Sequence, residues 1–228
     1  MKEYDLIAIG SGAGMSVLSD AVDSGAKAAL VDKGPMGGTC LNLGCIPSKM
    51  LIYSADRVVE IQESAKLGIT AEVKGVDFKA IMERMRTSIN GYSDGMRQAA
   101  LKTNEFDYYE GEGHFVSDYT LEVNGQQIKG DRIIIASGMR PFVPPVQGID
   151  TVDYLTNESA LQLTEKPDSL IIVGGGYIGV EFAHFFAAMG TKVTIIEMGN
   201  RLVANEDSEL SDLLRKKLGD RVKILTVV

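Results

Sequence analysis

The stretch Leu6-Ile7-Ala8-Ile9-Gly10-Ser11-Gly12-Ala13-Gly14 decides the fold of this chain. It joins an apolar run to a glycine-rich turn, and continuous apolar runs are typical of parallel strands that are buried on both faces. A predicted helix follows as far as Gly25, and a second apolar run, Ala28–Val31, ends at Asp32. The order strand, glycine turn, helix, strand and acidic residue predicts a βαβ unit that binds a dinucleotide.

The same order of elements occurs a second time near the end of the chain. Leu170–Val173 runs into Gly174-Gly175-Gly176-Tyr177-Ile178-Gly179, and a predicted helix leads from there to Gly190. The next apolar run, Val193–Ile196, ends at Glu197. One glycine fingerprint is weak evidence, but two copies with matching strands and acidic residues strongly indicate two dinucleotide-binding units.

Glycine and the acidic residue have separate roles in this pattern. Glycine allows a tight turn and lets the backbone approach a pyrophosphate, which binds at the N-terminus of the next helix. The acidic residue lies 20 positions after Gly12 and 21 after Gly176, where it can accept a hydrogen bond from a ribose hydroxyl. Two glycine-rich turns that bind nothing are the alternative, and the repeated context disfavours it. Met15 replaces the third glycine, present in the second copy as Gly179, and we expect a slightly shifted helix there with binding retained.

Composition and charge narrow the class of protein. The chain has 228 residues, of which 45% are hydrophobic and 24% charged, as in ordinary globular proteins with one large or two modest domains. The formal charge of −8 disfavours nucleic acid and anionic membrane surfaces as partners, because both attract clustered Lys and Arg. The apolar runs are short and rich in glycine, so no membrane span is predicted. Glu3 and Asp5 stand where a signal peptide carries positive charge, and we therefore expect a cytoplasmic protein.

The region between the two copies is predicted to be helical first and then β-rich. Residues 46–66 contain few helix breakers, and residues 78–102 repeat apolar side chains at helical spacing. Turns are predicted at His114 and at Asn124-Gly125. A proline-rich linker predicts a domain boundary near residues 141–158. The predicted strands cover residues 107–110, 120–123 and 132–136.

The only two cysteines, Cys40 and Cys45, lie five positions apart. A zinc site needs about four ligands, and His114 and His184 lie far away in sequence, so a metal site is disfavoured. Structural disulfides are rare in the cytosol, and a close pair therefore indicates a redox disulfide that opens and re-forms easily. A helix is predicted to begin after Cys45, and its dipole stabilises a thiolate there. Lys49, about one turn into that helix, adds positive charge.

The segment Gly37-Gly38-Thr39-Cys40-Leu41-Asn42-Leu43-Gly44-Cys45-Ile46-Pro47-Ser48-Lys49 resembles the redox motif of the class I pyridine nucleotide–disulfide oxidoreductases. That family includes dihydrolipoamide dehydrogenase, glutathione reductase, mercuric reductase and mycothione reductase. The resemblance covers essentially the whole chain, including the Ala136-Ser137-Gly138 turn. It implies an α/β fold with two Rossmann-like domains, three layers and parallel sheets. Residues 1–147 are expected to form an FAD-binding domain with the redox disulfide, and residues 148–228 an incomplete NAD-binding domain.

The resemblance implies a role for each matching residue on the FAD side. Cys40 is expected to be the interchange thiol that attacks the substrate disulfide, and Cys45 the thiol against the flavin ring. Lys49 and Glu181 are expected to form an ion pair near the reactive edge of the flavin. The residues expected to contact FAD are Gly10, Gly12 and Gly14 at the pyrophosphate, Asp32 at the ribose, and Lys33, Gly38, Thr39, Gly44, His114, Ala136, Ser137 and Gly138.

The resemblance also bears on the second nucleotide. A carboxylate at Glu197 accepts the 2′-hydroxyl of NAD and repels the 2′-phosphate of NADP, and one nearby base, Arg201, does not reverse this preference. NAD is therefore expected, which favours a dihydrolipoamide dehydrogenase over the NADP-linked reductases. The residues expected to contact NAD are Gly174, Gly176 and Gly179 at the pyrophosphate, Tyr177 or Ile178 over the nicotinamide pocket, and Glu197 at the ribose.

The implied activity passes electrons between the dihydrolipoyl group of an acyl-carrier complex, the Cys40–Cys45 disulfide, FAD and NAD, in a homodimer. A related disulfide reductase or mercuric reductase is one alternative. An FAD-binding fragment without turnover and a redox sensor that uses the cysteine pair as a switch are two others. The family's interface domain and its acid–base histidine match no segment here, and the apolar end at residues 222–228 is typical of an unprotected strand. We therefore expect this chain to be part of a longer protein.

Overall fold

The computed structural model describes residues 1–227, and its internal packing divides the chain into two compact units. The first unit contains residues 1–46 and 87–154. The second contains residues 47–86 and the chain from Leu155 onward. The boundary falls inside two long helices, α3 (Cys45–Glu63) and α4 (Phe78–Lys102), so each of them belongs partly to both units.

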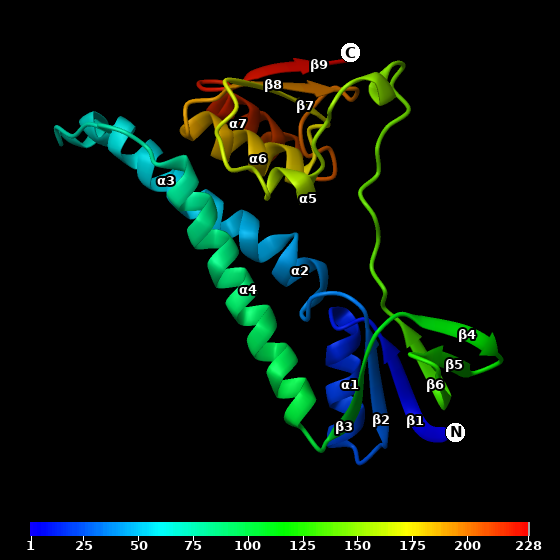
Figure 1. Ribbon diagram of the computed structural model, residues 1–228. Coiled ribbons are helices and arrows are strands. Elements are labelled where there is room, and N and C mark those ends of the chain that lie inside the picture. Colours follow the sequence, from blue (N-terminus) through cyan, green and yellow to red (C-terminus); the bar gives the residue numbers. More distant parts are fainter. Residues whose placement is uncertain (228) are drawn as a thin grey trace. The chain divides into compact units, whose positions relative to one another are not determined.

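The first unit is built on a sheet of six strands in the order β3-β2-β1-β6-β5-β4 (Figure 1). Strands β3, β2, β1 and β6 are parallel, whereas β5 runs antiparallel to both of its neighbours. The other elements that lie wholly within this unit are two α-helices and a 3₁₀ turn. The elements are β1 (Lys2–Ile9), α1 (Ala13–Asp23), β2 (Ala28–Asp32), α2 (Gly38–Asn42), β3 (Phe106–Glu110), β4 (Gly113–Ser117), β5 (Thr120–Val123), β6 (Gln126–Ile135) and η2 (Ile149–Thr151).

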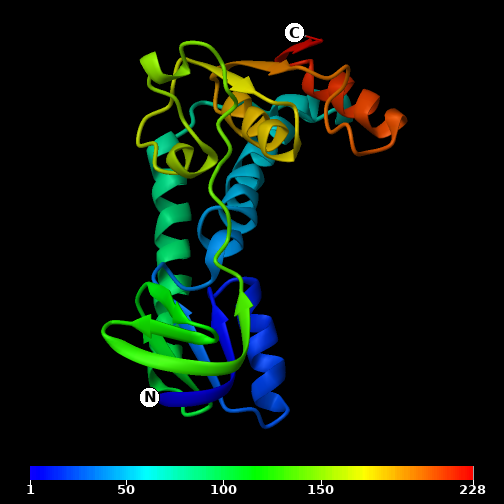
Figure 2. The same ribbon diagram turned by 90° about the vertical axis from the view of Figure 1, so that its right-hand side faces the viewer.

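The parallel strands of this sheet are covered on both faces, as their apolar sequences predict. Because side chains alternate along a strand, Ile7 points to one face and Ala8 to the other. Ile7 packs with Leu121 and other side chains of the β5–β6 hairpin. Ala8 packs with Leu18 of α1 and Ala100 of α4. Helices therefore cover one face and the antiparallel strands the other, with α1 seen alongside the sheet in Figure 2.

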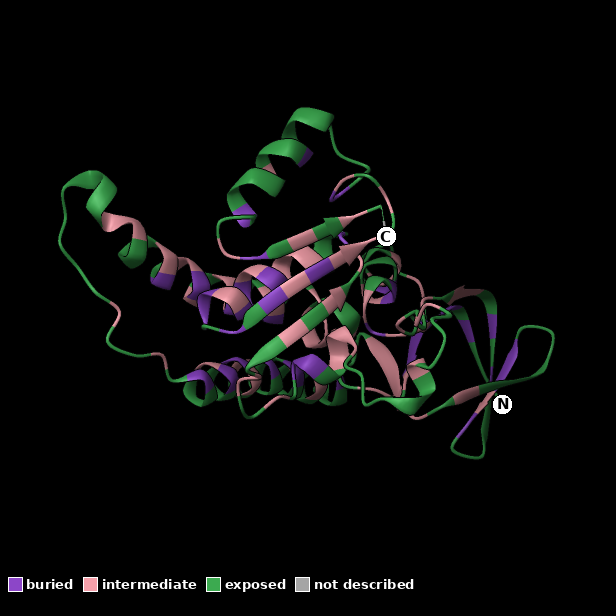
Figure 3. Cartoon of the chain, turned by 90° about the horizontal axis from the view of Figure 1, so that it is seen from above, coloured by how far each residue is buried: buried purple, intermediate pink, exposed green. Residues whose placement is uncertain are grey.

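The second unit contains a parallel three-stranded sheet in the order β7-β8-β9. Exposed and partly buried residues alternate along β7, so one face of this strand is open to solvent (Figure 3). Phe78, the first residue of α4, packs against Phe185 and Phe186 of α6 with tilted rings. The elements are η1 (Ser64–Leu67), α5 (Asn157–Ala160), β7 (Ser169–Val173), α6 (Tyr177–Ala188), β8 (Lys192–Glu197), α7 (Ser208–Leu218) and β9 (Lys223–Thr226).

Most predicted elements are present, with one error. Helix α4 covers residues 78–102 as predicted, and the predicted turn at Asn124-Gly125 joins β5 to β6 with positive φ at both positions. The turn predicted at His114 is wrong, because His114 is an exposed residue of strand β4 and pairs with Glu122. Four of the five residues of β4 are exposed, so no apolar alternation marks it in the sequence.

Because Met15 replaces the third glycine of the first copy, a slight shift of the first helix was expected, and the starts of α1 and α6 can be compared. Helices α1 and α6 begin at equivalent positions, directly after Gly12 and Gly176. Their caps differ, because ψ is −113° at Gly12 and −177° at Gly176. The backbone N–H of Met15 bonds to Gly12, three residues back, whereas Val180 bonds to Gly176, four residues back. The first turn of α1 is therefore tighter than that of α6.

The packing of residues 47–86 with the second unit does not follow the linear order of the chain. The predicted assignment of residues 1–147 to FAD and of residues 148–228 to NAD concerns cofactors rather than packing, and it stays a prediction.

None of the helices in residues 1–227 combines the length and the apolar character that crossing a bilayer requires.

Candidate functional site

The first glycine turn follows β1 and packs against the end of β6. Gly10 has a φ of +103°, which favours glycine, and a Cβ atom there would collide with the carbonyl oxygen of Ala136. A Cβ atom on Gly14 would lie 3.2 Å from the Cβ of Ala136. The backbone N–H of Ala136 donates to the carbonyl of Ile9 at 2.8 Å. The structure thus brings the predicted Ala136 turn directly against the predicted pyrophosphate loop.

Asp32 closes this turn from the end of β2. One carboxylate oxygen accepts a hydrogen bond from the backbone N–H of Ser11 at 2.6 Å, and the other accepts one from Gly34 at 2.8 Å. Each carboxylate oxygen can accept a further hydrogen bond, so a ribose hydroxyl can share the group. The neighbouring Lys33 forms an ion pair with Glu112 at 2.7 Å.

The cysteine segment begins at this same turn. A Cβ atom on Gly38 would lie 2.6 Å from the Cα of Gly12, so the two backbones are in contact. Thr39, the next residue, lies beside Gly138, with 3.7 Å between its Oγ1 and a Cβ placed on that glycine. Predicted FAD contacts from three separate stretches of sequence therefore lie together in the first unit.

The chain folds back on itself between the two cysteines. A Cβ atom on Gly44 would lie 3.0 Å from the carbonyl oxygen of Thr39 and 3.5 Å from the Cα of Cys40. Cys45 follows directly as the first residue of α3. Both cysteines are exposed, so a dithiol or disulfide substrate can reach them.

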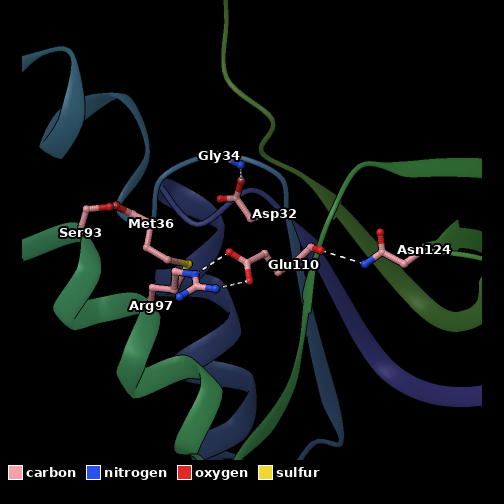
Figure 4. A network of polar contacts seen from close by, with 7 residues as sticks. All are labelled: Asp32, Gly34, Met36, Ser93, Arg97, Glu110 and Asn124. Atoms are coloured by element: carbon pink, nitrogen blue, oxygen red, sulfur yellow. Dashed lines mark hydrogen bonds and ion pairs between the residues drawn. The ribbon is translucent and has the colours of Figure 1, made fainter. Parts of the chain in front are cut away.

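Helix α4 holds the far side of the loop that follows Asp32 (Figure 4). Ser93 is buried and donates to the carbonyl of Met36 at 2.8 Å. Arg97 binds both carboxylate oxygens of Glu110, at 2.5 and 2.7 Å. The hydrogen bond from Arg97 holds the pKa of Glu110 below its ordinary value. Asn124 donates to the backbone carbonyl of Glu110 at 2.8 Å, and these contacts fix the ends of β2 and β3.

The second glycine turn has the same acidic brace as the first. One oxygen of Glu197 accepts a hydrogen bond from the backbone N–H of Gly175, and the other accepts one from Gly199, both at 2.6 Å. Gly174 has a φ of +108°. A Cβ atom on Gly179 would collide with the carbonyl oxygen of Gly174, which is why the third glycine of the fingerprint is needed here.

A cavity of about 240 Å³ opens beside this second turn. Tyr177 stands at it, and its hydroxyl donates to Glu206 at 2.6 Å. This hydrogen bond raises the pKa of Tyr177. Ile178 is exposed at the start of α6. The lining residues are Gly175, Gly176, Tyr177, Glu197, Arg201, Val203, Ala204 and Asn205.

Two polar contacts join α3 to α6 within the second unit. Lys49 donates to Glu181 at 2.5 Å, which is the predicted ion pair. Asp56 and His184 are 2.9 Å apart, and this contact was not predicted. The side chain of His184 is 20% exposed.

Both helices that follow the glycine turns leave their N-termini available to a ligand. Neither α1 nor α6 has a side-chain N-cap hydrogen bond within the described chain, and neither carries an acidic residue in its first turn. Helix α5, by contrast, is closed by a capping box of Thr156 and Ser159. Uncapped backbone N–H groups and the helix dipole attract phosphate. The starts of α1 and α6 therefore fit the pyrophosphate groups of two dinucleotides.

Several further residues of this site were not predicted. Ser11 connects the first turn to the next loop, because its Oγ accepts a hydrogen bond from the backbone N–H of Gly37 at 3.0 Å. Asn42 donates to three backbone carbonyls, and Glu206 accepts from Tyr177. No sequence pattern shows which partner such a side chain faces.

Residues 1–227 contain no cluster of three or more His, Cys, Asp or Glu side chains arranged to hold a metal ion.

The arrangement of these sites matches a known family. The model of the pyridine nucleotide-disulphide oxidoreductase family matches residues 4–227. The chain belongs to this family. Its members are flavoprotein oxidoreductases that bind FAD and use NADH or NADPH.

Relatives within this family carry several different names. Mercuric reductase from Staphylococcus aureus is 36% identical over 96% of this chain and 40% of the relative. Dihydrolipoyl dehydrogenase from Bacillus subtilis (strain 168) is 38% identical over 93% of this chain and 48% of the relative. The solved Cu(II) complex of the HOCl-induced flavoprotein disulfide reductase RclA from Escherichia coli has a TM-score of 0.85 and 31% identity, covering 100% of this chain and 50% of that one. The chain therefore spans half or less of the length of these relatives.

Proposed function

We propose that this chain binds FAD at the β1–α1–β2 turn and NAD at the β7–α6–β8 turn. The Cys40–Cys45 pair passes two electrons between a dihydrolipoyl group and these cofactors, and the whole protein is a dihydrolipoamide dehydrogenase. The observation that carries this proposal is the backbone contact between Gly12 and Gly38, because the cysteine segment then begins beside the glycine turn to which we assign FAD. A redox pair elsewhere in the fold would have no such link to a flavin.

The cysteines carry the exchange with substrate. A substrate thiolate attacks the Cys40 sulfur of the disulfide, which forms a mixed disulfide and releases Cys45 as a thiolate. The second substrate thiolate then attacks the substrate sulfur of the mixed disulfide, closes the substrate disulfide and releases Cys40. Cys45 is the first residue of α3, so this thiolate forms at the positive end of the helix dipole. FAD, when bound, supplies the two-electron acceptor that connects this thiolate to NAD.

The preference for NAD rests on Glu197. Its carboxylate lines the cavity at the second glycine turn, and both oxygens are held by backbone N–H groups at 2.6 Å. A carboxylate fixed in this way repels the 2′-phosphate of NADP and accepts the 2′-hydroxyl of NAD. Arg201 lines the same cavity and offsets part of this repulsion.

The choice of a dihydrolipoyl substrate rests on this nucleotide preference and on the residues that follow Cys45. The sequence Ile46-Pro47-Ser48-Lys49 resembles that of dihydrolipoamide dehydrogenases. Mercuric reductases and dihydrolipoyl dehydrogenases are similar to this chain to nearly the same degree, 36% and 38%. Mercuric reduction is therefore the second candidate. We further propose a homodimer and a cytoplasmic location for the whole protein.

The test is the visible absorption spectrum of the purified chain with FAD, before and after one equivalent of dihydrolipoamide. We expect a flavin spectrum that gains a long-wavelength band on reduction, because the Cys45 thiolate then lies against the flavin. The matched variants are Cys40→Ser and Cys45→Ser. Cys40→Ser should show the band without reductant, since Cys45 can no longer close a disulfide, and Cys45→Ser should never show it.

The outcomes separate the parts of the proposal. A flavin spectrum without the band in any variant would contradict the role of the cysteines and favour an FAD-binding fragment without turnover. A chain that stays colourless with FAD would contradict the FAD site itself. Reduction by dithiothreitol but not by dihydrolipoamide would contradict the dihydrolipoyl substrate and favour a related reductase.

A further inference from the structure

Asn42 lies between the two cysteines and has no part in the steps described above. It is the last residue of α2, and its Nδ2 donates to the carbonyl oxygens of Pro35 at 3.3 Å, Met36 at 2.9 Å and Gly38 at 2.9 Å. Only the amide nitrogen can face these oxygens, because an amide or carboxylate oxygen accepts hydrogen bonds and does not donate them. A single side chain therefore ties α2 to the loop that precedes it.

Helix α2 needs such a tie because it is short. It has five residues, and its N-cap, Gly37, provides no side-chain cap. Helices shorter than about 12 residues are marginal on their own, so the position of α2 depends on contacts with other segments. Cys40 is the central residue of this helix.

The loop that Asn42 binds is itself held from two other directions within the first unit. Ser11, beside β1, accepts a hydrogen bond from the backbone N–H of Gly37 at 3.0 Å. Ser93 of α4 donates to the carbonyl of Met36 at 2.8 Å, as Figure 4 shows. Met36 is 1% exposed, so this loop is anchored in the core. Asn42 thus connects a short helix to a fixed point.

We propose that Asn42 is a positioning residue for the redox pair: it holds Cys40 where Cys45 can close the disulfide. This inference rests on the redox role proposed above for the two cysteines. With Asn42 in place, the reduced segment already has the conformation that closure requires. Without it, the reduced segment gains conformational freedom that closure must remove, and the effective concentration of one thiol at the other falls.

The experiment measures the equilibrium between the dithiol and disulfide forms of the chain in glutathione redox buffers. In the forward direction the two thiols lose two electrons and two protons to glutathione disulfide, which leaves as two molecules of glutathione. Alkylation and mass measurement then report the fraction closed. We expect Asn42→Asp to lower the closure constant by about tenfold, equivalent to about 1.4 kcal/mol.

Asn124→Asp is the matched control. It makes the same chemical change in the same unit and removes one amide-to-carbonyl hydrogen bond, from Asn124 to Glu110 at 2.8 Å. Asn124 has a φ of +51°, which Asp also tolerates. The control should leave the closure constant at the value of the unsubstituted chain, because its contact lies outside the cysteine segment.

A second variant keeps the inference testable where Asn42→Asp does not fold. Asn42→Ala removes the same donor without adding charge, and it too should lower the closure constant. A folded Asn42 variant, judged by circular dichroism, that closes as readily as the unsubstituted chain would overturn the positioning role and leave the redox role intact. An unsubstituted chain that forms no disulfide in any buffer would instead overturn the redox role.

Discussion

The two glycine turns share a sequence pattern but differ in their surroundings. In the first turn, Gly10 lies against the backbone of Ala136, and Gly12 lies against Gly38. In the second turn, no described residue comes within 4 Å of a Cβ atom placed on Gly174 or Gly176. The first turn is therefore enclosed by its own unit, whereas the second is open above these two glycines.

This difference separates two reasons for glycine. At Gly10, protein packing and a φ of +103° both demand it. At Gly176 neither reason applies, because φ is −74° and the space is open. The reason that remains at Gly176 is close approach of a ligand to the backbone. Substitutions at these two positions should therefore affect different properties of the chain.

The largest effect is expected from Gly10→Ala. The left-handed backbone strain costs about 1–3 kcal/mol and the collision with Ala136 a further 1–3, so the free energy of unfolding should fall by about 3 kcal/mol or more. Unfolding in urea measures this loss. A variant as stable as the unsubstituted chain would show that the first turn is not enclosed in the way described here.

Gly176→Ala makes the same substitution at a position of the open turn where neither packing nor φ demands glycine. Because a Cβ atom meets no neighbour there, the free energy of unfolding should fall by less than about 1 kcal/mol, the cost of losing glycine at an N-cap. NADH binding, followed by fluorescence, should weaken instead. Equal loss of stability in Gly10→Ala and Gly176→Ala would remove the distinction between the two turns.

Substitution of the two acidic braces should lower the stability less than Gly10→Ala does, and by similar amounts at the two turns. Asp32 and Glu197 each accept two backbone hydrogen bonds, and an amide side chain presents only one oxygen to accept them. Asp32→Asn and Glu197→Gln should each lower the free energy of unfolding by about 1–3 kcal/mol. Asp131→Asn, at an exposed position of β6, serves as control and should stay within about 0.5 kcal/mol. A loss confined to one of the two braces would show that the turns are not held alike.

The resemblance between the turns was visible in the sequence, and the difference between them was not. The repeated pattern predicts that α1 and α6 start after Gly12 and Gly176, because local glycine and apolar spacing determine those elements. What encloses the first turn comes from Ala136 and Gly38, which are brought there by tertiary structure. A local pattern carries no information about such contacts.

The same limit explains the elements and contacts that were missed. Strand β4 is nearly all exposed, so it has no apolar alternation by which to recognise it. The packing of Phe78 on Phe185 links segments more than 100 positions apart, and no spacing rule predicts that pairing. Asn42 binds the carbonyls of Pro35 and Met36, and these two contacts depend on the path of the loop that precedes α2.

A loss of stability smaller than that of Gly10→Ala is expected at the other end of the first sheet, where β1 carries a polar cluster. Tyr4 is buried, and its hydroxyl donates to Asp107 at 2.5 Å and lies 2.7 Å from the hydroxyl of Tyr109. Burial and these hydrogen bonds raise the pKa of Tyr4. Tyr4→Phe should lower the free energy of unfolding at pH 7 by about 1–2 kcal/mol, because one of the lost bonds goes to a charged group that solvent partly screens.

The pH dependence of this loss gives a sharper test. The hydrogen bond from Tyr4, assisted by Lys2, holds the pKa of Asp107 below its ordinary value of 3.8. A lowered folded pKa means that the stabilisation is present above pH 3.8 and disappears as the pH falls through the folded value. The difference between the unsubstituted chain and Tyr4→Phe should therefore shrink on acidification below pH 3.8. Tyr109→Phe leaves the hydrogen bonds of Tyr4 and Lys2 to Asp107 in place, so its effect should stay nearly constant with pH. If both differences were flat, Asp107 would not be the acceptor that gives Tyr4 its stabilising role, and the first sheet would have no acid-sensitive contact at this end.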